Sequence, residues 1–132
     1  MIDERYKYSE LTSRIIRSAM EVHSFLGNGF QEVIYQRALA LGFASQNIGF
    51  AREFEMTIHY KGTSIGTRRV DFFVEEKVMV ELKAVIRLED VHLAQAINYL
   101  EAYNMEVGLL INFGSKSLTF KRVMHTPRSK KS

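Results

Sequence analysis

The chain has 132 residues, of which 46% are hydrophobic and 25% are charged, and this is the composition of one ordinary globular domain. It contains no cysteine, which excludes disulfide, zinc-finger and thiol chemistry and fits a reducing cytoplasm. Met1 to Glu10 is polar and charged, so we expect no signal peptide. Apolar runs such as residues 107–113 are too short to span a bilayer, so we expect no membrane partner.

The net charge of +3 is concentrated at the C-terminus. Lys and Arg number 18 against 15 Asp and Glu, and three of the basic residues, Arg128, Lys130 and Lys131, lie in the last five positions. The rest of the chain is neutral, so global charge alone gives little support for a nucleic-acid partner. We expect one domain over residues 1–125 and a basic, flexible tail over residues 126–132.

The hydrophobic pattern predicts a helix over residues 9–26, with Ser9 as its N-cap and the turn Gly27-Asn28-Gly29 as its end. A second helix is expected over residues 30–46. Strands follow over residues 54–60, 65–74 and 78–86, then a helix over 91–103 and strands over 107–113 and 117–123. This order predicts an α/β or α+β fold with helices flanking a mixed sheet.

Two neighbouring strands of this prediction carry charged residues among apolar ones. Side chains alternate between the faces of a strand, so Asp71 lies on the face opposite Val70, Phe72 and Val74. Glu81 and Lys83 share a face in the same way. A hairpin through residues 75–77 would then bring Asp71 opposite, or nearly opposite, Glu81.

Two carboxylates at that range repel each other, and a hard divalent cation between them reverses the sign of the interaction. Mg²⁺ prefers oxygen ligands, often one or two carboxylates with waters and substrate phosphates. Lys83 on the same face can stabilise phosphate charge or activate a water. The group suits phosphodiester hydrolysis. A solvated sheet face or a buried ion pair between Glu81 and Lys83 would give the same spacing, and both interpretations stay open.

Two helical segments add polar residues. Gln95 and Tyr99 are four residues apart on one helix face, and His92 lies near that face. Glu32 falls in the first turn of the second helix, where the helix dipole favours a carboxylate, and Tyr35 follows three residues later. Taken alone, these residues also fit an ordinary polar helix face and a capped helix start.

Taken together, the segments resemble a known family. Gly29-x-x-Glu32-x-x-Tyr35 resembles the motif that names the GxxExxY proteins, which are small bacterial and archaeal proteins of the PD-(D/E)XK nuclease superfamily. The stretch from Val80 to Ala84 is similar to the Glu-x-Lys strand of that family. Similar helix and strand segments follow, so the resemblance runs from about residue 8 to residue 123. Val70 replaces the proline of the superfamily name, and Asn28 stands where many relatives have proline.

The resemblance implies a restriction-endonuclease-like core with the order α-β-β-β-α-β. It implies that Asp71, Glu81 and Lys83 are catalytic, and that Glu32, Asp71 and Glu81 hold Mg²⁺ or Mn²⁺. Gln95 and Tyr99 resemble a Gln-x-x-x-Tyr element that supports the site or contacts substrate in RecB-like nucleases. His92 and Tyr35 are expected to help them.

The expected function is a metal-dependent nuclease of the cytoplasm that acts on nucleic acid, DNA rather than RNA. A homodimer or a protein partner would supply the basic surface that the neutral body lacks. One alternative is a non-catalytic module on the same fold that binds nucleic acid or protein. Another is a protein acting on small phosphorylated molecules, although no phosphate-binding glycine loop is present.

Overall fold

The computed structural model describes residues 7–126 of the chain. The helices are α1 (Ser9–Leu26), α2 (Glu32–Ser45) and α3 (Asp90–Tyr103), and the strands are β1 (Phe50–Tyr60), β2 (Thr63–Val74), β3 (Val78–Lys83), β4 (Val107–Asn112) and β5 (Thr119–Met124). The predicted element order is therefore confirmed. The basic tail lies almost entirely outside the described residues. No helix within residues 7–126 is both long and apolar enough to cross a membrane.

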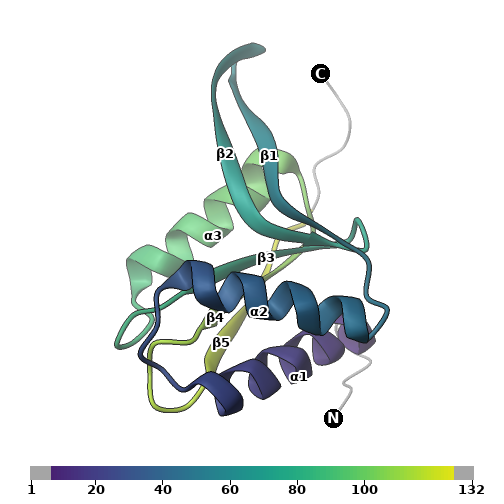
Figure 1. Cartoon of the computed structure of the whole chain (residues 1–132). Coiled ribbons are helices and arrows are strands. Elements are labelled where there is room, and N and C mark those ends of the chain that lie inside the picture. Colours follow the sequence, from purple (N-terminus) through teal and green to yellow (C-terminus); the bar gives the residue numbers. More distant parts are fainter. Residues whose placement is uncertain (1–6, 127–132) are drawn as a thin grey trace.

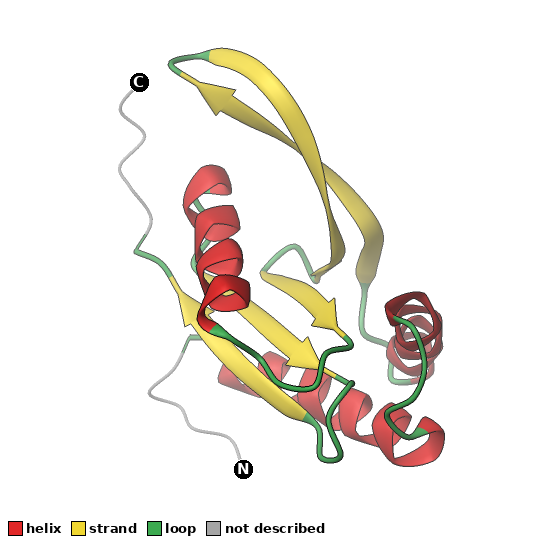
Figure 2. Ribbon diagram, turned by 90° about the vertical axis from the view of Figure 1, so that its left-hand side faces the viewer, coloured by secondary structure: helices red, strands yellow, loops and turns green. Residues whose placement is uncertain are grey.

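The strands form one mixed sheet in the order β1-β2-β3-β4-β5. β3 and β4 run parallel and are joined through α3, whereas the other neighbours are antiparallel. Helices α1 and α2 lie on one side of the sheet and α3 on the other (Figures 1 and 2). The result is the α+β fold with a helix-flanked sheet that the sequence predicted.

The larger core lies between the sheet and helices α1 and α2. The predicted apolar face of α1 packs into it, including the fully buried Ile15 and Ala19. Tyr35, Leu39 and Phe43 come from α2, and the inner residues of β2, β3 and β4 complete the cluster. A smaller core on the other side joins α3 to the sheet through Met56, Val70, Met79, Ala96, Leu100 and Val123. The sheet is therefore covered on both faces, as its continuous apolar strands predict.

Three local expectations are corrected. The N-cap of α1 is Tyr8, in a left-handed conformation with φ of 59°, and Ser9 is instead the first helical residue. β3 ends at Lys83 rather than at residue 86. Val70 packs in the α3-side core, whereas Phe72 and Val74 pack in the other one. Burial still alternates along β2, but β2 pairs with β3 only as far as Phe72.

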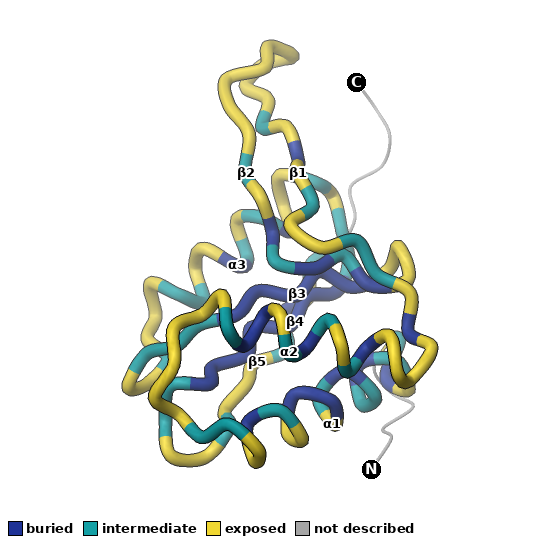
Figure 3. The backbone as a smooth tube through the Cα atoms, in the orientation of Figure 1, coloured by how far each residue is buried: buried dark blue, intermediate teal, exposed yellow. Residues whose placement is uncertain are grey.

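The hairpin of β1 and β2 extends well beyond the body of the molecule (Figures 1 and 3). Near the body its side chains Met56 and Val70 are buried against α3. From residue 57 to residue 67 every residue is exposed except the half-buried Ile58. We call residues 57–67 the outer arm.

Candidate functional site

The candidate site begins where the β2–β3 ladder opens. Val74, Phe73 and Phe72 pair with Val78, Met79 and Val80, as the predicted hairpin register requires. At the next position the carboxylates replace the backbone partners. Oε1 of Glu81 accepts a hydrogen bond from the backbone N–H of Asp71 at 2.9 Å, and Oδ2 of Asp71 accepts one from the N–H of Leu82 at 2.8 Å.

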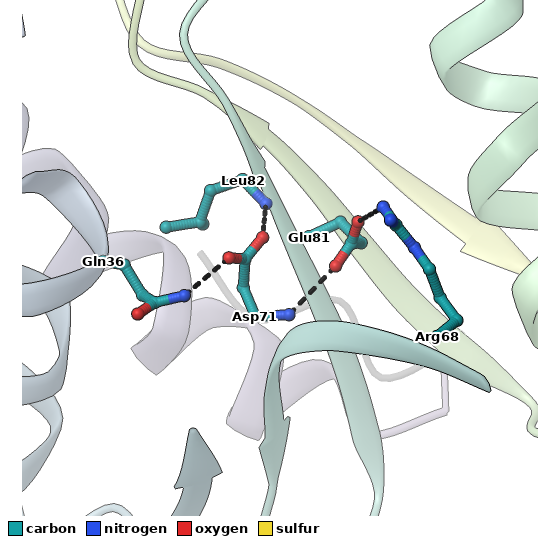
Figure 4. Close-up of polar contacts among 5 residues, drawn as sticks. All are labelled: Gln36, Arg68, Asp71, Glu81 and Leu82. Carbon is teal, nitrogen blue, oxygen red and sulfur yellow. Dashed lines mark hydrogen bonds and ion pairs between the residues drawn. The ribbon is translucent and has the colours of Figure 1, made fainter. Parts of the chain in front are cut away.

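Figure 4 shows this exchange, in which each carboxylate binds the backbone of the opposite strand. Charge-assisted bonds of this kind are stronger than neutral ones. Asp71 and Glu81 thus hold the two strands together at the point where β2 turns away. We call this arrangement the carboxylate clasp.

The other oxygen of Asp71 faces helix α2. Nε2 of Gln36 donates a hydrogen bond to Oδ1 of Asp71 at 2.7 Å. Gln36 is only 6% exposed, so its side-chain amide is buried where it makes this hydrogen bond. Sequence reasoning missed Gln36, although it lies four residues after Glu32 and therefore on the same helix face.

The other oxygen of Glu81 faces Arg68 and helix α3. An Nη atom of Arg68 lies 3.4 Å from Oε2 of Glu81, and the Arg68 guanidinium lies 4.9 Å from the centre of the Tyr99 ring. Within the described residues, Nε of Arg68 is buried without a hydrogen-bond partner. Arg68 therefore links Glu81 to Tyr99, a contact that strand alternation does not predict.

The Glu81 carboxyl has a raised pKa. Burial, followed by the charge of Asp71, raises the pKa of Glu81 to about 7. The N–H of Asp71 and the charges of Arg68 and Lys83 oppose this rise without cancelling it. At neutral pH the group is poised between its two protonation states, which is a common property of functional carboxyls.

Lys83 is the last residue of β3, on the same face as Glu81, and it is half-buried. The chain beyond it is fixed by Asn112, whose fully buried amide accepts from the N–H of Val85 and donates to its carbonyl, both at 2.9 Å. An added Cβ at Gly114 would collide with the backbone of Ala84 and Val85, so only glycine fits there. This packing holds the end of β3 in a defined position.

The other predicted site residues lie on helices α2 and α3. Glu32 is the first residue of α2 and is exposed. Gln95 is exposed on α3, one turn before Tyr99. His92 caps α3, because its Nδ1 accepts the N–H of Glu89 at 3.0 Å.

Tyr35 stabilises the turn between α1 and α2. Its hydroxyl donates to the carbonyl of Gly27 at 2.6 Å and accepts from the N–H of Phe30 at 3.1 Å, while its ring stacks on Phe113 with centroids 4.7 Å apart. Tyr35 thus fixes the turn that leads into α2 and sets where Glu32 begins the helix.

The carboxylate clasp has the donor set of a hard divalent cation. Across residues 7–126, no three His, Asp or Glu side chains gather as a preformed metal site, so Glu32 is not clustered with the pair. Each oxygen of Asp71 and Glu81 accepts one hydrogen bond, and a carboxylate has about four acceptor positions, so roughly half remain for a cation. Two carboxylates with waters and phosphates are a usual set for Mg²⁺.

Comparison with known proteins identifies the class. A family model described as the PD-(D/E)XK nuclease superfamily matches residues 9–123, so the chain belongs to this superfamily. No match is found among the curated proteins. A solved structure described as "Crystal structure of SSO0001" is similar over 74% of this chain, with a TM-score of 0.55 and 15% identity, which supports the fold. This chain spans about half of that structure, 52% of its length.

Proposed function

We propose that the protein is a GxxExxY-type nuclease that uses Mg²⁺ or Mn²⁺ to hydrolyse phosphodiester bonds, those of DNA in preference to RNA. The observation that carries this proposal is the carboxylate clasp, in which a buried Glu81 with a pKa of about 7 lies beside Asp71, with Lys83 on the same face. A divalent cation would relieve the repulsion within the pair and favour ionised Glu81. The superfamily match supports this interpretation of the site.

The proposed roles rest on the contacts of Asp71, Glu81 and Gln36 and, for the other residues, on the family resemblance. Asp71 and Glu81 would hold the cation, which when bound polarises a phosphate and lowers the pKa of a water. Glu32, which is exposed at the start of α2 and not clustered with this pair, would join them as a third ligand when the cation binds. Lys83 orients that water or neutralises charge in the transition state. Gln36 orients Asp71. Gln95 and Tyr99 support the site from α3 or contact the substrate, while His92 and Tyr35 position α3 and α2.

Cleavage of labelled single- and double-stranded DNA and RNA tests the proposal, with Mg²⁺, Mn²⁺ or EDTA present. We expect metal-dependent cleavage that Asp71→Ala and Lys83→Ala each reduce at least a thousandfold, about 4 kcal/mol of transition-state stabilisation. The matched controls are Glu76→Ala and Lys77→Ala, which change exposed residues of the β2–β3 turn and should cut like the wild type.

A second measurement separates the metal from the chemistry. Titration calorimetry with Mn²⁺ should show one binding site that Asp71→Ala removes and Lys83→Ala retains, because Lys83 is not a ligand. Cleavage that survives both substitutions would come from a contaminant and would contradict the proposal. Lack of both cleavage and Mn²⁺ binding would favour a non-catalytic binding module.

The proposal includes a cytoplasmic location and a single domain over residues 1–125, followed by the basic tail. It also includes nucleic acid as the partner, with a homodimer or a second protein extending the binding surface. Light scattering at several protein concentrations would measure the oligomeric state directly.

A further inference from the structure

The outer arm is a long, exposed two-stranded ribbon with a defined shape. Its strands stay in register up to the pair Tyr60–Thr63, with one irregularity between Ile58 and His59. Lys61 and Gly62 form the turn with positive φ angles of 50° and 81°, as a two-residue turn of type I′ requires. An isolated two-stranded hairpin is only marginally stable in water, so an extension of this length indicates a surface that meets a partner.

The charge of this ribbon selects the kind of partner. No acidic residue occurs in the outer arm, which carries Lys61, and Arg68 and Arg69 follow at its base beside Glu53 and Glu55 of β1. Hydroxyl groups of Thr57, Thr63, Ser64 and Thr67 add neutral donors. An acid-free surface of this composition suits phosphates.

The ion pairs of Arg69 at the base of the arm are weak enough to leave its guanidinium available. Arg69 lies 4.0 Å from a carboxylate oxygen of Glu53 and 3.9 Å from one of Glu55, and its side chain is 67% exposed. Exposed pairs of this length contribute little. Lys61 is exposed at the tip, where its ammonium lies 5.4 Å from the centre of the Tyr60 ring.

We propose that the outer arm enters a groove of duplex DNA and places the phosphate backbone next to the carboxylate clasp. The major groove is about 12 Å wide and 8.5 Å deep and admits a two-stranded ribbon. From Val70 to the turn the hairpin of β1 and β2 spans roughly 25 Å, at about 3.3 Å per residue. Arg68 at the base contacts Glu81, so DNA held along the arm leads directly to the clasp. This inference rests on the proposed nuclease function and names the structure that selects duplex DNA.

The test is fluorescence anisotropy with a labelled duplex of about 20 base pairs, roughly two turns of the groove, in EDTA, so that binding is measured without cleavage. One variant is Lys61→Glu. A second replaces residues 58–66 with Asn-Gly, which closes the hairpin after the pair Thr57–Thr67. The control is Lys121→Glu, the same charge reversal on exposed β5 at the opposite edge of the sheet. Circular dichroism and thermal unfolding verify that each variant is folded.

We expect Lys61→Glu to raise the Kd severalfold and the shortened arm to raise it at least tenfold. The slope of log K against log salt should become shallower by about 0.9 for each phosphate that the variant no longer neutralises. Lys121→Glu should stay within twofold of the wild type. Wild-type protein that does not bind the duplex, or arm variants that bind it as the wild type does, would overturn the proposal. An equal weakening in Lys121→Glu would also overturn it.

Two further measurements distinguish this inference from the nuclease proposal. Asp71→Asn should bind the duplex without cutting it, so loss of cleavage with arm-dependent binding leaves the arm assignment in place. If the wild type cuts DNA in a metal-dependent way and the arm variants bind DNA as tightly as the wild type does, the arm assignment is wrong and the nuclease proposal stands. Sedimentation equilibrium gives the oligomeric state of the wild type and of the shortened-arm variant. If the wild type is a dimer, the variant is a monomer and both bind DNA equally, the arm is a contact between two copies.

Discussion

The two faces of the sheet differ in what they bury. The face under α1 and α2 packs fifteen buried residues into one apolar cluster, whereas the α3 face packs six, beside the charged groups of Glu81 and Arg68. The first face therefore supplies most of the hydrophobic stabilisation. The second, thinner face tolerates a buried carboxyl whose pKa is far from its usual range. Because most of the hydrophobic packing lies on one face and the charged groups lie on the other, substitutions can test each face by itself.

The largest effect should come from truncating the thicker core. Phe72 is fully buried and meets Phe43 and Phe50 with ring centroids 5.1 and 5.5 Å away. We expect Phe72→Ala to lower the free energy of unfolding by about 4 kcal/mol and Met79→Ala, in the smaller cluster, by about 2 kcal/mol. Urea unfolding of both variants measures the difference. Equal decreases would contradict the contrast between the two faces.

The next effect is a pH dependence that belongs to Glu81. Its folded pKa, about 7, lies above the ordinary value of 4.5, so the folded state binds the proton more tightly than the unfolded state. The stability that this provides is complete below about pH 4.5 and is lost as the pH rises through about 7, up to about 3 kcal/mol. Unfolding of metal-free wild type and Glu81→Gln between about pH 4.5 and pH 8 measures it.

Glu81→Gln should remove this slope, because its amide does not titrate. Glu55→Gln, on the exposed side of β1, should retain it and serves as the control. Mg²⁺ competes with the proton at Glu81, so its affinity should rise as the pH approaches about 7. A wild-type slope equal to that of Glu81→Gln would show that Glu81 titrates normally.

A smaller effect is expected at Gln36, which connects the clasp to the α2 face. Gln36→Leu keeps the volume and leaves Oδ1 of Asp71 without its donor, at a cost of about 1–2 kcal/mol in stability. Because the donor also orients a proposed metal ligand, the affinity for Mn²⁺ should fall about tenfold. Calorimetry compares it with Arg37→Ala, which changes the neighbouring exposed residue. Unchanged Mn²⁺ affinity would limit Gln36 to a packing role.

The sequence predicted the pairing of β2 with β3 but not the residue at which this pairing ends. Apolar alternation and the short turn at residues 75–77 were enough to pair Val74 with Val78 and to bring Asp71 and Glu81 together. The departure of β2 from β3 is a bend, and period-two patterns contain no information about a bend. For this reason the packing of Val70 in the α3-side core and the contact between Arg68 and Glu81 were not anticipated.

Gln36 and Asn112 were missed for a different reason. Gln36 lies on the helix face of Glu32, and Asn112 is the one polar residue in the apolar run from residue 107 to residue 113. Asn112 was therefore visible as a polar residue in a buried position, which usually has a specific partner. Gln36 was visible only as a polar neighbour of Glu32. Their partners lie 35 and 27 residues away in the sequence, and only the tertiary structure brings them together.

The smallest expected effect concerns Tyr99 on the α3 face. The Arg68 guanidinium lies 4.9 Å from the centre of the Tyr99 ring, and Arg68 also pairs with Glu81. Tyr99→Leu should cost about 0.5–1 kcal/mol because the cation–π interaction is removed, and Tyr99→Phe, which keeps the ring, should cost less. A double-mutant cycle with Arg68→Met isolates the pair, because Tyr99→Leu should cost less once the cation is gone. An equal cost of Tyr99→Leu with and without Arg68 would mean that Glu81 alone positions Arg68, and α3 would then serve the site only by packing.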